Sequence, residues 1–216
     1  MKQLIACWLG AACVHAIAFG SGQVKLTLQM PGWPPGSASF SQKVLPDGSK
    51  LVQLNLEMKD PAGRSVRVRS ESSYDSKGSP IRKFLESIVD KPRDRRQVVV
   101  TFDEEGAHVV EEKGGKRTTK HLPLAKAAPR ENPSEFWFLR DRPKPGAKAQ
   151  YYRFDIDSMS WVLTTTTYVG PKTVAVGRSK LSGHLIQDDR AQVVLDDKGL
   201  PLRMEVGNAV FTRASE

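Results

Sequence analysis

Residues 51–59 read Leu-Val-Gln-Leu-Asn-Leu-Glu-Met-Lys, and their pattern defines the main type of secondary structure. Apolar side chains stand at every second position, at Val52, Leu54, Leu56 and Met58, with polar side chains between them. A period of two is the period of a β-strand, because successive side chains point to opposite faces. Such a strand buries one face and exposes the other, as the strands of antiparallel sheets do.

The same alternation recurs along most of the chain. It is found over residues 24–30, 66–69 and 200–206. Glycine-containing turns fall between the runs, at 47–48, 61–63, 78, 106, 114–115, 146, 170–171 and 197–199. No spacing suggests a β-α-β crossover. The sequence therefore predicts a mainly β fold, with about ten short strands in an antiparallel sheet.

One hairpin can be aligned residue by residue. If Gly114 and Gly115 form a two-residue turn, Glu112 faces Arg117, and His108 faces His121. The Glu112–Arg117 pair would contribute roughly 0.2–1 kcal/mol across the two strands.

Two distant segments share a turn pattern. Residues 74–82 and 195–203 carry Asp, Lys, Gly, Pro and Arg at matching places. We interpret the match as the same turn chemistry rather than a domain repeat, with a proline opening the return strand. It favours a strand over 80–86. The alternative is a helix capped by Ser79, because Ile81, Phe84, Leu85, Ile88 and Val89 have helical spacing.

The aromatic residues gather in one place. Residues 132–135, Asn-Pro-Ser-Glu, form a helix-start signature, and Phe136, Trp137 and Phe138 follow it. We expect a short helix that plugs the open side of a curved sheet, with an apolar ligand pocket as the functional alternative. The candidate pocket residues are Phe136, Trp137, Phe138, Trp161 and Trp33. Trp33 lies in Gly-Trp-Pro-Pro-Gly, which we expect to fold back over a barrel end rather than form a recognition loop.

Residues 1–18 read as a secretory signal peptide. A single cation precedes an apolar run that ends in Ala16-Ile17-Ala18, and cleavage is expected after Ala18. A membrane anchor and a lipoprotein signal at Cys13 are the alternatives, but the run is shorter than the ~20 residues of a membrane span. The prediction is an exported protein, periplasmic or secreted, with one β-rich domain over 19–216 and no transmembrane segment after cleavage.

Cleavage changes the composition in two ways. Both cysteines, Cys7 and Cys13, lie in the signal, so the remaining chain has no disulfide, cysteine nucleophile or thiolate metal site. Removing Lys2 lowers the net charge from +9 to +8, with 32 cations against 24 acids.

The basic residues cluster in two segments. The candidate anion-binding residues are Arg93, Arg95, Arg96, Lys116 and Arg117. For an exported protein the available acidic partners are lipid headgroups and anionic envelope polymers. The alternative is a solvated surface that favours solubility. Nucleic-acid binding is not expected, since aromatic residues are not interleaved with the cations.

Catalytic signatures are weak. No G-x-S-x-G nucleophile motif occurs, and the paired acids, such as Asp196-Asp197, are better explained by turns. His108 and His121, if adjacent, could bind Zn²⁺ or Cu²⁺ or sense pH, but no third ligand is evident, and solvated surface histidines are the favoured interpretation. We therefore expect no cofactor, and a metal-dependent enzyme is the least favoured alternative.

The later half of the chain resembles a known class of envelope proteins. The matching features are Lys144-Pro145-Gly146 and the segments 168–170, 177–178, 184–186 and 195–203. They are similar to those of lipoprotein-carrier-like half-barrels (LolA/LolB-like) and related uncharacterised periplasmic families. The resemblance implies a strongly curved antiparallel half-barrel around one or two short helices. It also implies a non-enzymatic envelope protein that binds an apolar or lipid-like ligand or aids envelope assembly.

Overall fold

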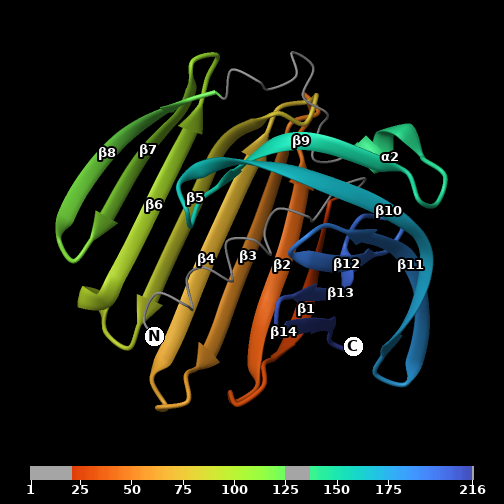
Figure 1. The fold of residues 1–216 in the computed structure, drawn as a ribbon. Coiled ribbons are helices and arrows are strands. Elements are labelled where there is room, and N and C mark those ends of the chain that lie inside the picture. Colours follow the sequence, from red (N-terminus) through yellow and green to blue (C-terminus); the bar gives the residue numbers. More distant parts are fainter. Residues whose placement is uncertain (1–20, 125–136, 216) are drawn as a thin grey trace.

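A computed structural model describes residues 21–124 and 137–215. They form one antiparallel sheet that curves strongly and does not close (Figure 1). The strands are β1 (Gly22–Gln29), β2 (Gly36–Val44), β3 (Lys50–Lys59), β4 (Ser65–Tyr74), β5 (Pro80–Val89), β6 (Arg95–Phe102), β7 (Gly106–Lys113), β8 (Lys116–Pro123), β9 (Lys148–Asp155), β10 (Ser160–Val176), β11 (Ser179–Gln187), β12 (Ala191–Leu195), β13 (Pro201–Val206) and β14 (Ala209–Arg213). The helical elements are η1 (Pro92–Asp94) and α2 (Trp137–Asp141).

The predicted fold class is confirmed, but the strand count of about ten is wrong: the described residues form fourteen strands. The predicted number of strands is too low because some strands lack the alternation of apolar and polar residues. Strand β10 runs for 17 residues through four consecutive threonines, 164–167, which give no hydropathy period. Strand β2 is rich in small polar residues.

Strands β1 and β14, the first and last described strands, pair in the middle of the sheet. Its order is β8-β7-β6-β5-β4-β3-β2-β1-β14-β13-β12-β11-β10-β9, so the first strand pairs with the last. Every other ladder joins strands that follow one another in sequence. Strands β8 and β9 are therefore the two edges of the sheet.

A single turn geometry connects four of these strand pairs. Each is a five-residue turn with glycine at the fourth place in a left-handed conformation: Gly48, Gly63, Gly78 and Gly199. The matching segments noted in the sequence are two of them. In these two, Asp75 Oδ1 accepts from the N–H groups of Lys77 and Ser79, and Asp196 Oδ1 accepts from those of Lys198 and Leu200. Strand β5 follows the first, which confirms the strand over 80–86.

The hairpin between β7 and β8 has the predicted register. Glu112 pairs with Arg117, and His108 pairs with His121. Gly114 and Gly115 have φ values of 57° and 76°, as a primed two-residue turn requires.

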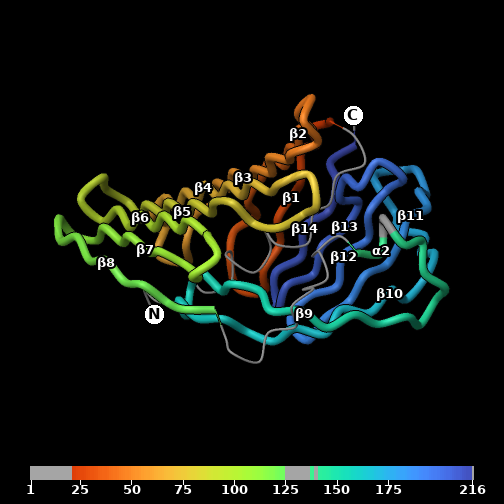
Figure 2. The backbone as a smooth tube through the Cα atoms, turned by 90° about the horizontal axis from the view of Figure 1, so that it is seen from above, coloured from red at the N-terminus to blue at the C-terminus, as the bar shows by residue number. Residues whose placement is uncertain are grey.

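Side chains fill the space between β9–β10 and strands β5–β8, where the described strands form no backbone ladder. Figure 2 shows the sheet curling so that β9 and β10 return toward β5–β8. The Phe154 ring lies 5.6 Å from that of Phe102 and 5.4 Å from that of Trp161. Trp161 Nε1 donates to the carbonyl of Leu122 at 3.2 Å, and Lys83 Nζ to that of Phe154 at 3.5 Å. These contacts hold β9 and β10 against β5, β6 and β8 without a hydrogen-bonded ladder between them.

The concave face holds the main core. Strands β1–β7 and β12–β14 contribute most of its buried apolar side chains, and α2 adds Trp137 and Phe138. Both of these residues are about 95% buried, and their rings meet edge to face at 6.1 Å. The short aromatic helix thus packs into the curved sheet as expected, although its predicted start at 132–135 lies outside the described residues. None of the helical elements described is long and apolar enough to cross a membrane.

The buried face of β9 and β10 is polar. Arg153 is 99% buried, and Thr164 and Thr166 are buried on the neighbouring strand. The Tyr151 hydroxyl lies 2.9 Å from that of Thr166. Among the described residues, Nε and Nη2 of Arg153 have no hydrogen-bond partner. Removing a cation from water without such compensation is costly.

Replacing Arg153 should therefore stabilise the protein. We expect Arg153→Met, which keeps much of the side-chain volume, to raise the free energy of unfolding by about 1–4 kcal/mol. Urea unfolding at neutral pH measures the change. Arg178→Met, at an exposed position, is the matched control and should stay within about 0.5 kcal/mol of the wild type. A loss of stability in Arg153→Met would show that the guanidinium is compensated.

Candidate functional site

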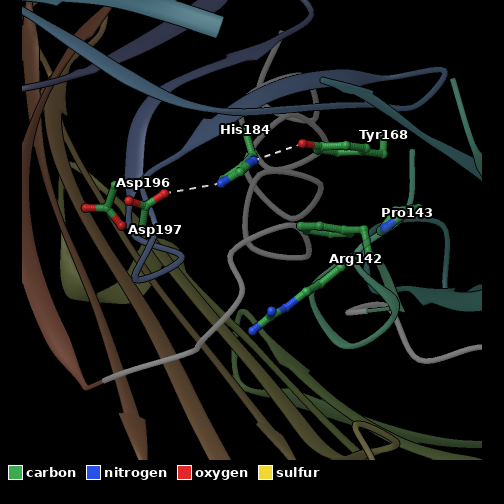
Figure 3. A pocket seen from close by; sticks show the side chains of 7 residues that line it. Arg142, Pro143, Tyr168, His184, Asp196 and Asp197 are labelled. Carbon is green, nitrogen blue, oxygen red and sulfur yellow. Dashed lines mark hydrogen bonds and ion pairs between the residues drawn. The ribbon is translucent and has the colours of Figure 1, made fainter. Parts of the chain in front are cut away.

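A pocket of about 420 Å³ lies between the end of α2 and the strands β10–β12 (Figure 3). Phe138, Pro143 and Tyr168 form its apolar wall. The polar lining residues are Arg142, His184, Asp196 and Asp197. The volume falls within the range of roughly 300–1,000 Å³ that small-molecule sites occupy.

A hydrogen-bonded chain crosses the pocket. His184 Nε2 lies 3.2 Å from Asp197 Oδ1, and His184 Nδ1 lies 3.0 Å from the Tyr168 hydroxyl. A carboxylate only accepts, so Nε2 carries a proton and Nδ1 accepts from the tyrosine in the neutral ring. These two hydrogen bonds fix the orientation of the His184 imidazole and of the Tyr168 phenol.

Arg142 adds a cation to the pocket at a conformational cost. It directly follows α2 and has a φ of 45°, a left-handed conformation that glycine or asparagine adopts more readily. A non-glycine residue there costs roughly 1–2 kcal/mol. Figure 3 shows its side chain running along the pocket wall below Tyr168. Among the described residues, Arg142 forms no ion pair, whereas Asp196 is bonded to Arg213 at 2.8 Å and Asp197 to His184.

The five candidate pocket residues lie in different places. Phe138 lines the pocket, and Trp137 is buried beside it in the core. Trp161 belongs to the aromatic cluster that joins β9 and β10 to β6, and Trp33 is half-buried against the core. Phe136 lies outside the described residues.

The five candidate anion-binding residues divide into two groups. Arg95 Nε is 2.6 Å from Glu86 Oε1, and Arg96 Nε is 2.7 Å from Glu111 Oε1, so both arginines already have carboxylate partners. Arg93, Lys116 and Arg117 are exposed. The register Arg96–Lys113–Lys116 brings the two basic segments to the same end of the sheet.

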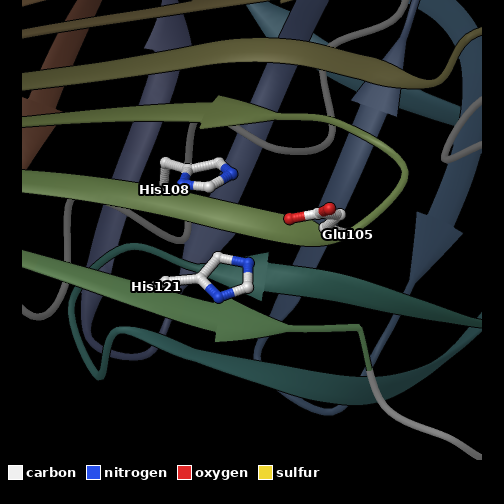
Figure 4. A group of neighbouring side chains, drawn as sticks. All are labelled: Glu105, His108 and His121. Carbon is white, nitrogen blue, oxygen red and sulfur yellow. The ribbon is translucent and has the colours of Figure 1, made fainter.

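The two candidate metal ligands lie together. The rings of His108 and His121 stack with their centroids 4.5 Å apart, and Glu105 from the preceding turn faces them (Figure 4). One ligand atom from each of these three residues lies within 4.8 Å of the others. Glu105 supplies the third donor atom of this cluster, which the sequence did not reveal. Two imidazoles and a carboxylate are a donor set that zinc accepts.

A second group of charges lies where β9 turns into β10. Asp155 accepts from the N–H groups of Asp157 and Ser158 and pairs with Arg190. Only 8% of the Asp157 side chain is exposed, and Arg96 is the cation beside it, with 3.6 Å between Nη1 and Oδ1. Burial, together with the neighbouring charge of Asp155, raises the pKa of Asp157 to about 6, although Arg96 and Arg190 oppose the shift. This arrangement ties the turn to β6.

The site residues that sequence reasoning missed carry weak sequence signals. Arg142 follows a helix end, where a glycine would signal the cap. Tyr168 and His184 lie on opposite sides of the bulge between Tyr168 and Gly170, which shifts the register of β10 and β11. The turn expected at 170–171 is wrong, because β10 continues through these residues and shifts register at Gly170 instead.

The fold and the pocket define a β-barrel-like protein with an open, curved sheet. No protein-family model matches the sequence, and a search of curated proteins found no match either. Among solved structures, the chain is similar to a beta-barrel-like protein of the domain of unknown function DUF1849 from Brucella abortus, with a TM-score of 0.58, 10% identity, and coverage of 92% of this chain and 98% of that one. A DUF1089 family protein from Pseudomonas aeruginosa also matches, with a TM-score of 0.41, 13% identity, and coverage of 79% and 90%.

The comparison with the Brucella protein supports a barrel-like fold of unknown function, and the likeness to lipoprotein-carrier-like half-barrels stays a prediction. The Brucella protein shares the barrel-like architecture over nearly its whole length. Neither protein is described as a lipoprotein carrier.

The raised pKa of Asp157 predicts a pH-dependent stability. Between about pH 4 and pH 6 the folded state binds the Asp157 proton more tightly than the unfolded state does, so this group's contribution to stability falls as pH rises through that window. Asp157→Asn removes the effect. We expect the variant to gain up to about 3 kcal/mol relative to the wild type between pH 4 and pH 7.

Urea unfolding at unit pH intervals measures this gain. Asp94→Asn, at an exposed carboxylate, is the control and should show a nearly constant difference from the wild type. A constant difference for Asp157→Asn as well would contradict the prediction.

Proposed function

We propose that the protein is an exported, non-enzymatic envelope protein that binds an amphipathic ligand with an acidic head group. The observation that carries the proposal is the pocket at the end of α2, in which apolar and cationic groups stand side by side. The resemblance to lipoprotein-carrier-like half-barrels supports a lipid-like ligand. The signal-like sequence over residues 1–18 supports export.

The apolar wall suits the body of such a ligand. The Phe138 ring, buried on its other side in the core, and the rings of Pro143 and Tyr168 offer a rigid surface. Burying apolar ligand surface against it contributes roughly 25 cal/mol per Å².

The charges of the pocket favour an acidic head. Both lining aspartates are bonded to basic partners, Arg213 and His184. Arg142 is left to face the ligand, and a guanidinium binds carboxylate or phosphate through paired N–H donors. The conformational cost at this residue is offset if the ligand interaction needs an arginine there.

Oleate and oleyl alcohol test the proposal, because they share an apolar chain and differ in the charge of the head. After removal of bound lipid, the protein should bind one oleate, at least tenfold more tightly than oleyl alcohol, in calorimetric titrations. Arg142→Gln should lose this preference and keep the weaker binding of the alcohol. Phe138→Leu should weaken both.

Arg67→Gln, on the exposed face of β4, is the matched control and should bind both compounds as the wild type does. Thermal unfolding of each variant without ligand separates loss of binding from loss of fold. The proposal is wrong if the wild type binds neither compound, or if Arg142→Gln keeps the preference for oleate.

Export is tested separately. Expression with the native first 18 residues in a Gram-negative host should deliver the protein to the periplasmic fraction, with Phe19 as the first residue by N-terminal sequencing. Replacing Leu4 and Ile5 by arginine should hold it in the cytoplasm, because the apolar run is interrupted. Full-length protein in the cytoplasm of wild-type cells would contradict export.

A further inference from the structure

The β7–β8 hairpin fixes two imidazoles side by side. His108 and His121 form a directly opposed pair in the ladder, and their rings stack with an interplanar angle of 25°. The tight Gly114–Gly115 turn sets this register. Ligands on a paired strand are held more accurately than ligands on a loop.

The turn before β7 brings a carboxylate to the same pair. Glu105 lies in the turn between β6 and β7, and its backbone is tied to the end of β8, because the Leu124 N–H donates to the Glu105 carbonyl at 3.3 Å. Gly106 allows this approach: a Cβ there would lie 2.3 Å from the carbonyl oxygen of Leu122. The three side chains therefore come from one region of the sheet, in which the β6–β7 turn is hydrogen-bonded to the end of β8 (Figure 4).

Asp103 links the turn to the first imidazole. Its Oδ1 accepts from the N–H groups of Glu105 and Gly106 at 2.9 and 3.1 Å, and its Oδ2 lies 2.7 Å from His108 Nε2. A carboxylate bonded to a metal-binding histidine orients the ring and raises its basicity.

We propose that Glu105, His108 and His121 form a surface binding site for Zn²⁺. Two imidazole nitrogens and a carboxylate oxygen are borderline ligands that suit zinc, and three protein ligands leave a coordination position for water. Around a tetrahedral zinc the ligand atoms stand roughly 3.3 Å apart. The stacked rings direct their nitrogen lone pairs nearly parallel, so zinc binding requires a change of rotamer at the exposed His121, which unstacks the rings, together with a rotation of the exposed Glu105.

Zinc titration of the untagged chain that begins at Phe19 tests the site. We expect one high-affinity Zn²⁺ per chain by competition with a chromogenic chelator. His108→Ala and His121→Ala should each weaken binding at least tenfold, and Glu105→Gln by a smaller factor. Asp103→Asn should weaken it by about 10-fold through the lost orientation of His108. Co²⁺ in place of zinc should give visible absorption bands in the wild type that His121→Ala lacks.

The matched control is His184→Ala, which removes the other histidine of residues 19–216 and should bind zinc as the wild type does. Unfolding midpoints without metal show that the exposed His121 variant keeps its fold. The proposal is wrong if the wild type binds less than one Zn²⁺ per chain at micromolar zinc concentration. It is also wrong if His121→Ala binds as tightly as the wild type, or if His184→Ala loses the zinc.

Discussion

Side-chain contacts that hold β9 and β10 against β5, β6 and β8 complete the core of this protein. Strands β8 and β9 have no ladder between them, so rings and long side chains must span the gap: Phe102, Phe154, Trp161 and Lys83. These contacts turn an open sheet into a barrel-like enclosure with one core. Without them the apolar concave face of β3–β7 would be exposed to water at the cost of the hydrophobic free energy that holds the fold.

Both candidate sites lie at places where the regular sheet is interrupted. The pocket forms where β10 leaves its pairing with β9 and shifts register against β11, beside the end of α2. The histidine pair lies at the edge hairpin, where a turn closes over the last residues of β8. Continuous ladders fill their faces with side chains from neighbouring strands, whereas bulges and edges leave polar groups available for ligands.

Local patterns predicted the regular part of the fold well. The glycine pair at 114–115 was sufficient to align β7 with β8, and the shared turn of 74–82 and 195–203 identified β5 as a strand. Both succeed because turn chemistry acts over a few residues. The polar inner faces of β9 and β10 escaped detection, since Arg153 and Thr164 give no apolar alternation. Glu105 and Arg142 escaped as well, because their roles arise from a turn and a helix end that bring distant residues together.

The charges along β8 have a consequence for the behaviour of the protein in solution. Residues 116–121 are exposed on an edge strand, whose outer backbone groups pair with no other described strand and offer a ladder to another chain. Lys116, Arg117 and Lys120 set three positive charges along that edge, so a second copy that approaches it in register meets like charge. These charges therefore oppose edge-to-edge pairing between copies, which would extend the fourteen-stranded sheet of the described residues.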